Sequence, residues 1–492
     1  MTEPLFSQLL RISAFTVFQT LCSTAIALIV GVAAAFFTAR RDFFGKRCLL
    51  SLSSVPFCIP TLLIALGFVS FFGMSGTLNT LLKTIFALDE SPITFLYSFS
   101  GIIITQGFYN FPLVMSSVHD CWSQIPQEQA EAARLLGANN SRVFTTVTVH
   151  QLMPAIVSSC MLVFLYCYFS FMIVLLFGTI GCTTLEVEVY KAARVSLNFR
   201  YTVSLALVET TLACVFVGFY ALLEQKSGRT RGLSFTQTTK RHAITAPSER
   251  FFAGILFTLI LLFFIAPIAS IVYNAFSSIK SLFTLNTLCH ALSARGFSKA
   301  LTTTILCALA TAFFSVLIAF IYAVFVRSRA TNSDNLVLRI IPMMPMSISS
   351  VVLGIVITAL VRRGNALLLV TAQVFLAWPL AFRQIYASLS KIPEETIDAA
   401  RLFCANPLTR IRTMYLPSSL RGILSAAGFC FAVSAGDTSL PLVMAIPRFD
   451  TLSLFTYRLA GTYRFHEACA AGLILGMICA IVFALANRLK EK

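Results

Sequence analysis

The sequence is built from long apolar runs that are separated by short polar segments. A helix that crosses a bilayer needs about 20 mainly apolar residues. Runs of roughly this length occur at 12–39, 48–72, 93–118, 151–177, 201–223, 251–275, 301–326, 337–361, 366–389, 419–446 and 467–489. The chain is therefore predicted to be an all-α polytopic membrane protein with about 11 transmembrane helices, or 12 if the N-terminus is truncated.

The composition agrees with a chain that is surrounded by lipid. Only 12% of the residues are charged, against about 25% in an ordinary soluble domain, and the mean hydropathy is +0.84. The net charge of +17 comes from Lys and Arg between the apolar runs, which is the positive-inside pattern. Nucleic-acid binding, which needs basic patches, is therefore not expected. The basic segment "RRDFFGKR" and the linker 224–250 are expected to face the cytoplasm.

Two stretches of the chain have counterparts further along. "IPQEQAEAARLLGAN" at 125–139 aligns with "IPEETIDAARLFCAN" at 392–406, and "TTLEVEVY" at 183–190 aligns with "DTLSLFTY" at 450–457. The offset is the same in both alignments, without a gap between them (392 − 125 = 267 and 450 − 183 = 267). A constant offset indicates a tandem duplication of one membrane unit.

The predicted units are 1–223 and 251–492, joined by the cytoplasmic linker 224–250. Each unit has a five-helix core, and the second begins with an additional span at 251–275. This extra span lets both copies run in the same direction, so the units are parallel repeats about an axis along the membrane normal.

The segment 125–139 is a polar helix in an otherwise apolar chain. Glu128 and Glu131 stand near the positive end of the helix dipole, and Gly137 suits the left-handed conformation that ends a helix. One such helix would be an ordinary solvated connector. Two copies at equivalent positions indicate two docking sites for a partner at the cytoplasmic surface.

These segments resemble the EAA loops of ATP-binding-cassette importer permeases, here at 125–154 and 392–423. In that family the loop forms a coupling helix that docks on a cytoplasmic ATPase. The resemblance assigns ATPase coupling to Glu131, Ala132, Ala133, Gly137, Asp398, Ala399, Ala400 and Cys404. The sequence departs from the family pattern where His150 replaces a proline, Cys404 a glycine and Asp398 a glutamate.

The same resemblance implies the partners and the substrate. The expected partners are two copies of an ABC ATPase subunit, an extracytoplasmic substrate-binding protein and the lipid of a bacterial inner membrane. No G-x-x-x-x-G-K-[ST] loop occurs, so the chain is expected to lack a cofactor and enzymatic activity and to leave ATP to the ATPase. The five histidines are isolated, so no metal site is expected. Residues 434–475 are similar to the thiamine permeases of the family, which predicts thiamine or its phosphates, with iron(III) as the alternative.

Three residues are candidates for the translocation path, namely Asp437, its repeat counterpart Ser170, and Tyr168. An ionisable group at membrane depth usually faces a bundle interior or an aqueous cavity, although Asp437 also follows Gly436 and is placed to cap a broken helix. Tyr168 belongs to an aromatic group in the fourth span that either lines the path or packs against neighbouring helices. Glu186 and Glu188 are predicted on the outer face, in contact with the binding protein or in a solvated loop.

Two other classes of function remain open at this point. A secondary transporter driven by an ion gradient would need intramembrane carboxylates or interrupted helices that form an ion site. A membrane-embedded enzyme would need His, Asp or Cys side chains clustered near one face.

Overall fold

The computed structural model describes residues 5–52, 59–179, 181–228, 242–243, 247–277, 286–328, 338, 341–361, 364–403 and 406–491. Most of these residues are helical, and two-residue strands β1 (Arg41–Asp42) and β2 (His242–Ala243) pair in parallel. Nine of the described helices are long and apolar enough to cross a membrane, or ten if one bent pair counts as a span. The predicted all-α polytopic fold is confirmed.

The contacts divide the chain into two compact units. The first unit consists of Met1–Pro56, Ile64–Glu188 and Gly218–Ser270, and the second consists of Phe57–Leu63, Val189–Val217 and Ile271–Lys492. The predicted boundaries at 1–223 and 251–492 follow the repeat along the sequence. The contacts instead place residues 189–217, which belong to the first repeat, in the second unit. They place most of the span 251–275, which follows the linker, in the first unit.

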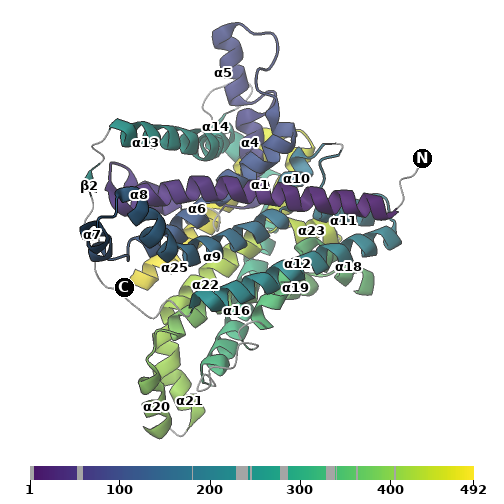
Figure 1. Ribbon diagram of the computed structural model, residues 1–492. Helices are drawn as coiled ribbons and strands as arrows, with labels where there is room; N and C mark the ends of the chain where they lie inside the picture. The colour runs from purple at the N-terminus through teal and green to yellow at the C-terminus, as the bar shows by residue number, and fades with distance from the viewer. Residues whose placement is uncertain are drawn as a thin grey trace. The chain divides into compact units, whose positions relative to one another are not determined.

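The first unit is organised around α1 (Leu5–Arg40), which packs along α6 (Phe99–Trp122) and α9 (Val149–Tyr168) (Figure 1). The helix after the linker also belongs here, because the ring of Phe263 contacts Phe72 and Phe108, and Arg41 forms an ion pair with Glu249. Its remaining elements are α2 (Lys46–Ser51), α4 (Thr61–Phe72), α5 (Thr77–Phe86), η2 (Phe95–Tyr97), α7 (Gln127–Leu135), α8 (Asn140–Val143), η3 (Phe144–Thr148), α10 (Phe171–Phe177), the start of α11 (Leu185–Arg194), the end of α12 (Phe199–Gly228), α13 (Pro247–Ile260) and η4 (Leu261–Ile265).

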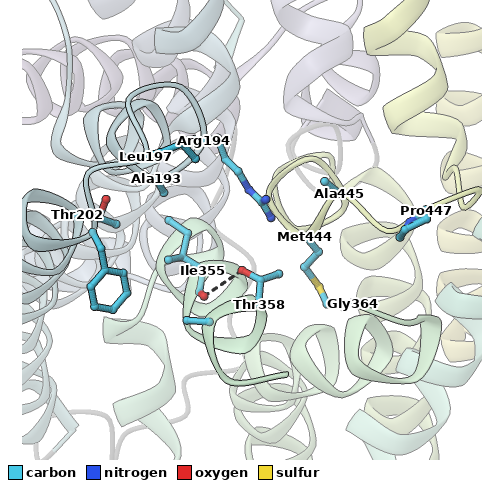
Figure 2. A pocket seen from close by; sticks show the side chains of 12 residues that line it. Ala193, Arg194, Leu197, Thr202, Ile355, Thr358, Gly364, Met444, Ala445 and Pro447 are labelled. Atoms are coloured by element: carbon cyan, nitrogen blue, oxygen red, sulfur yellow. Dashed lines mark hydrogen bonds between the residues drawn. The ribbon is translucent and has the colours of Figure 1, made fainter. Parts of the chain in front are cut away.

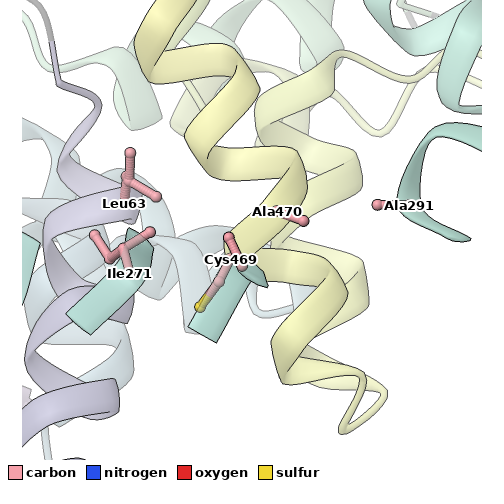
Figure 3. Close-up of a cluster of buried hydrophobic side chains, with 6 residues drawn as sticks. Leu63, Ile271, Ala291, Cys469 and Ala470 are labelled. Carbon is pink, nitrogen blue, oxygen red and sulfur yellow. The ribbon is translucent and has the colours of Figure 1, made fainter. Parts of the chain in front are cut away.

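The second unit is organised around α16 (Phe297–Ser328), α19 (Ala366–Leu389), α22 (Leu416–Gly436) and α25 (Phe465–Glu491). Figure 3 shows one of its apolar clusters, formed by Leu63, Ile271, Ala275, Ala291, Cys469 and Ala470. The shorter elements are α14 (Ala266–Phe276), α15 (Asn286–Ser293), η5 (Ile341–Ser347), α18 (Ser350–Val361), α20 (Glu394–Phe403), α21 (Pro407–Arg410), η6 (Ile411–Tyr415), α23 (Ser439–Met444) and α24 (Leu452–Gly461).

The structure confirms the tandem repeat element by element. Both bounds of α19 follow from those of α6 by the offset found in the sequence (366 − 99 = 267 and 389 − 122 = 267), and the same offset relates η6 to η3 and α24 to α11. Before α6 the offset is larger, because the counterpart of Thr16 is Thr304 (304 − 16 = 288). The change in offset (288 − 267 = 21) coincides with α5 and η2, which the second repeat lacks among its described residues.

Several predicted spans are interrupted in the structure. The span 151–177 is divided between α9 and α10 at Phe169 and Ser170, and the span 419–446 is divided between α22 and α23 at Asp437 and Thr438. The span 337–361 bends by 85° between η5 and α18, and the span 48–72 is not one helix, since α2 ends at Ser51 and α4 begins at Thr61. An apolar run predicts that a segment lies in lipid, but it does not predict where the hydrogen-bonded helix within that segment stops and starts again.

Candidate functional site

The first predicted coupling helix is α7, which follows Pro126. It ends where predicted, because Gly137 has a left-handed backbone with φ of +85°. The N–H of Gly137 donates to the carbonyl of Arg134 at 2.9 Å and the N–H of Ala138 to that of Ala133 at 3.0 Å, so the last carbonyls of the helix are satisfied. Glu131 and Ala132 are exposed and Ala133 is partly exposed, which leaves this face accessible.

The second predicted coupling helix is α20, and it differs from the first in its electrostatics. Asp398 is exposed and forms an ion pair with Arg401 at 2.8 Å, and the Arg401 guanidinium also donates to the carbonyl of Ser328. In the first repeat, Glu131 forms no ion pair within the described part of the chain, although Arg134 stands at the position of Arg401. Ala399 and Ala400 are partly exposed, and Cys404 lies outside the described residues.

Both helices end on a pair of large apolar side chains that point away from the protein. Leu135 and Leu136 are 89% and 90% exposed, and Leu402 and Phe403, at the equivalent positions of the second repeat, are 84% and 87% exposed. These four residues were missing from the predicted site. The signal was present as two consecutive apolar residues at the end of an otherwise polar helix, repeated in the second copy. Such apolar pairs on a polar helix are typical of a protein contact surface.

Each predicted coupling helix is followed along the chain by a short helix, α8 or α21, that leads into a long helix. Asn139 accepts a hydrogen bond from the N–H of Arg142 at 2.8 Å, and its counterpart Asn406 accepts one from the N–H of Leu408 at 3.0 Å, so both turns are capped in a similar way. A π-helical turn follows in both copies, η3 and η6, and then α9 and α22 begin. Single π turns inside helices are frequent at functional sites.

Asp437 lies at the break between α22 and α23. Its Oδ1 accepts hydrogen bonds from the N–H groups of Ser439 at 3.0 Å and Leu440 at 3.4 Å, which caps the start of α23. The carbonyl of Asp437 accepts from the hydroxyl of Ser453 at 2.8 Å. The carboxylate therefore has the local capping role that the sequence allowed, and its predicted role in the path stays a prediction.

Ser170 occupies the equivalent break in the first unit, between α9 and α10, and it is 8% exposed. Tyr168 is 1% exposed and its ring stacks on Phe164 with centroids 6.2 Å apart. Both side chains are buried, and a role in the path stays a prediction for both.

Glu186 is buried, so the prediction that its side chain contacts a binding protein or lies in a solvated loop is wrong. It is 1% exposed, because the start of α11 is tied into the first unit by a hydrogen bond from the N–H of Leu185 to Thr16. Glu188 is partly exposed and accepts from the Thr183 hydroxyl at 3.4 Å.

Glu209 is a further buried acid, and it was not among the residues predicted from the sequence. Glu209 lies in α12, inside the predicted span 201–223, and is 1% exposed, with Ser349 beside it at the bend before α18. Its repeat position is Gly476 (476 − 209 = 267), so only the first copy has an acid there. The signal was an acidic residue inside an apolar run, which marks a functional position in most membrane proteins.

Comparison with known proteins identifies the class. A family profile described as binding-protein-dependent transport system inner membrane component matches residues 27–229 and 333–491. The chain belongs to this family, and the two matched segments agree with a fused two-unit permease.

Individual relatives are similar over different lengths. The thiamine transport system permease proteins of Brucella suis biovar 1 and Brucella abortus are 26% identical over 496 residues, which cover 97% of this chain and 87% of theirs. A putative 2-aminoethylphosphonate transport system permease protein of Salmonella choleraesuis is 31% identical over 206 residues, which cover 42% of this chain and 72% of its own.

Proposed function

We propose that the chain forms the translocation path of an ATP-driven importer, with one ATPase subunit docked on α7 and another on α20. One observation supports this docking above the others, namely that both helices end on exposed apolar pairs at repeat-equivalent positions, Leu135–Leu136 and Leu402–Phe403. Apolar side chains that protrude from a polar surface are the anchors that a partner pocket buries. Two equivalent anchors on one chain suit two equivalent partner subunits.

The connection from each anchor to the membrane supports a mechanism. The capping residues Asn139 and Asn406 join the coupling helices to α9 and α22, which are interrupted further along at Ser170 and Asp437. A movement of the ATPase would therefore reach an interrupted helix in each unit. ATP binding and hydrolysis would bias the equilibrium between inward-open and outward-open states through these helices, since a ligand shifts a conformational equilibrium by its different affinities for the states.

The docking is tested by replacing all four anchor residues with serine in the complex purified with its ATPase. We expect the ATPase to be lost on purification and ATP-dependent uptake into proteoliposomes to stop. Met74→Ser is the matched control, because Met74 is 51% exposed and lies outside both coupling helices. A correctly folded fourfold variant that keeps its ATPase and its uptake would contradict the proposal, as would gradient-driven uptake without any ATPase.

For the substrate, we propose thiamine or its phosphates, delivered by an extracytoplasmic binding protein. The support is the similarity to thiamine permeases over 97% of the chain. The similarity to a putative 2-aminoethylphosphonate permease covers 42% of the chain, and iron(III) is the alternative from the sequence. Uptake of labelled thiamine, thiamine phosphate, 2-aminoethylphosphonate and iron(III) by the same complex distinguishes these substrates, and saturable ATP-dependent uptake of thiamine compounds alone is the expected result.

A further inference from the structure

A pocket of about 370 Å³ lies in the second unit, away from the coupling helix (Figure 2). One wall is the corner between α11 and α12, another is α18, and the turn after α23 closes it. The lining residues are Ala193, Arg194, Leu197, Phe199, Thr202, Ile355, Thr358, Ala359, Gly364, Met444, Ala445 and Pro447. A pocket of this size accommodates a small molecule or a lipid headgroup.

The described residues that line the pocket carry one charge, and it is positive. Among the twelve lining residues, all of which are described, Arg194 alone is ionisable. Its guanidinium points toward the turn after α23 and donates one hydrogen bond to the carbonyl of Val443. A guanidinium has five N–H donors, so further donors remain for an anion. The hydroxyls of Thr202 and Thr358 already donate to the carbonyls of Asn198 and Ile355, so the anion is left to Arg194. Arg favours phosphate because its planar fork fits two oxygens.

The walls of the pocket continue as apolar surface. Beyond Phe199 and Thr202, α12 exposes Val203 at 39% and Leu207 at 63%, and beyond Thr358, α18 exposes Leu360 at 78%. In a protein that crosses a bilayer, exposed apolar side chains on membrane helices contact acyl chains. The guanidinium of Arg194 therefore lies next to an apolar surface on α12 and α18 that suits acyl chains.

The pocket lies at the N-terminal end of α19, which places it near one face of the bilayer. Gly364 lines the pocket two residues before α19 begins, and α20 begins five residues after α19 ends (394 − 389). The 24 residues of α19 span about 36 Å at 1.5 Å per residue, against about 30 Å of hydrocarbon. The pocket and the coupling helix α20 therefore lie at opposite ends of a membrane-spanning helix.

We propose that this pocket binds a phospholipid of the extracytoplasmic leaflet, with its phosphate on Arg194 and one acyl chain along α12 and α18. An anionic headgroup such as phosphatidylglycerol is preferred, since none of the described lining residues is acidic. Only the choice of leaflet rests on the proposed function, because it depends on α20 being cytoplasmic. Leu197 and Ala445 line the pocket with φ of 49° and 44°, and non-glycine residues in this conformation cluster at binding sites.

The test uses the full chain, purified with its ATPase and stripped of lipid, and native mass spectrometry with added phosphatidylglycerol or phosphatidylcholine. Arg194→Gln is expected to lower phosphatidylglycerol binding by about tenfold, because a charge-assisted hydrogen bond is lost, and Arg194→Lys by less. Arg200→Gln is the matched control, since Arg200 is an exposed residue of α12 that does not line the pocket. Binding to that variant should equal binding to the unaltered protein.

A second variant tests the pocket without changing the charge. Ala359→Trp fills the space from an exposed position on α18, and it should reduce phosphatidylglycerol binding while thermal unfolding stays unchanged. Three results would overturn the proposal: unaltered lipid binding in both variants, displacement of the lipid by millimolar inorganic phosphate, or equal loss in the Arg200→Gln control. Absence of ATP-dependent uptake by the unaltered complex would contradict the proposed function and leave the lipid measurement intact.

Discussion

The backbone N–H of Leu452 donates a hydrogen bond to the hydroxyl of Thr304 at 2.7 Å, and in the first unit the N–H of Leu185 donates to Thr16 at 2.9 Å. Each threonine also donates to the carbonyl four residues earlier in its own helix, at 2.8 Å in both cases. Thr304 is 4% exposed and Thr16 is 1% exposed, so water does not replace either bond. In each repeat, a threonine of the first long core helix thus holds the start of a short helix, α11 in the first repeat and α24 in the second.

Thr304→Val should destabilise the protein. Valine has nearly the same shape and accepts no hydrogen bond, so the buried N–H of Leu452 would lose its partner, at a cost of about 1–3 kcal/mol. Thermal unfolding in detergent is expected to show a lower midpoint, and Thr16→Val should have a similar effect. Thr302→Val is the control, because Thr302 lies on the exposed side of α16, and equal midpoints for Thr304→Val and Thr302→Val would show that the bond contributes nothing.

Gly137→Ala should loosen the end of the first coupling helix. A Cβ at this position meets no atom within 4 Å, so the cost comes from the left-handed backbone alone, about 1–2 kcal/mol. Hydrogen exchange of residues 127–139 should become faster and ATPase retention weaker. Gly218→Ala also meets no atom within 4 Å, but its helical backbone suits alanine, so it should be neutral or slightly stabilising. The reverse order of effects would contradict this account.

Charge reversal of Glu131 together with Asp398, each to arginine, should release the ATPase and abolish uptake. Asp398→Arg also replaces an ion pair with Arg401 by a repulsion at the same spacing. The control is the pair Glu128→Arg and Glu395→Arg, which are exposed acids three residues earlier in each helix and again occupy equivalent positions of the two repeats (395 − 128 = 267). A pull-down in which the first double variant retains the ATPase as well as the control does would count against the coupling assignment.

Two substitutions of Asp437 distinguish the contribution of its helix cap from that of its charge. Asp437→Asn keeps an oxygen that accepts from the N–H groups of Ser439 and Leu440, whereas Asp437→Ala removes it, at a cost of about 1 kcal/mol. Asp437→Asn should therefore unfold at nearly the same temperature as the unaltered protein, and Asp437→Ala at a lower one. If the carboxylate also attracts a cationic solute, the asparagine variant will show a raised KM for uptake, and an unchanged KM would restrict Asp437 to capping.

The repeat and most of the membrane spans could be predicted because both depend on the identity and order of residues along the chain rather than on contacts between distant residues. Apolar runs locate α1, α16 and α25, and the constant offset between the two repeats predicts the pairing of α7 with α20 and of α11 with α24. The left-handed turn at Gly137 was also predictable, since glycine is the residue that adopts it at least cost.

Other features depend on contacts that no local pattern contains. The pair Gly436–Asp437 indicated a possible break in the span 419–446, whereas the break at Ser170 lies inside an apolar run where hydropathy does not distinguish a helix that stops from one that continues. The burial of Glu186 follows from a hydrogen bond between its neighbour Leu185 and Thr16, which is far away along the chain. The grouping of α13 with the first unit likewise depends on ring contacts such as those of Phe257 with Phe37 and Phe43.

Among the described residues, the ion pair between Asp398 and Arg401 in α20 has no counterpart in α7, where Glu131 and Arg134 stand at the equivalent positions. In a permease assembled from two identical polypeptides, a substitution that improved one helix would appear in both. Here both helices belong to one gene product, so they are synthesised in equal numbers and each can change without the other. The fused chain thus carries one copy of each of these unlike helices, so that any partner of one helix can be held with a different strength from a partner of the other.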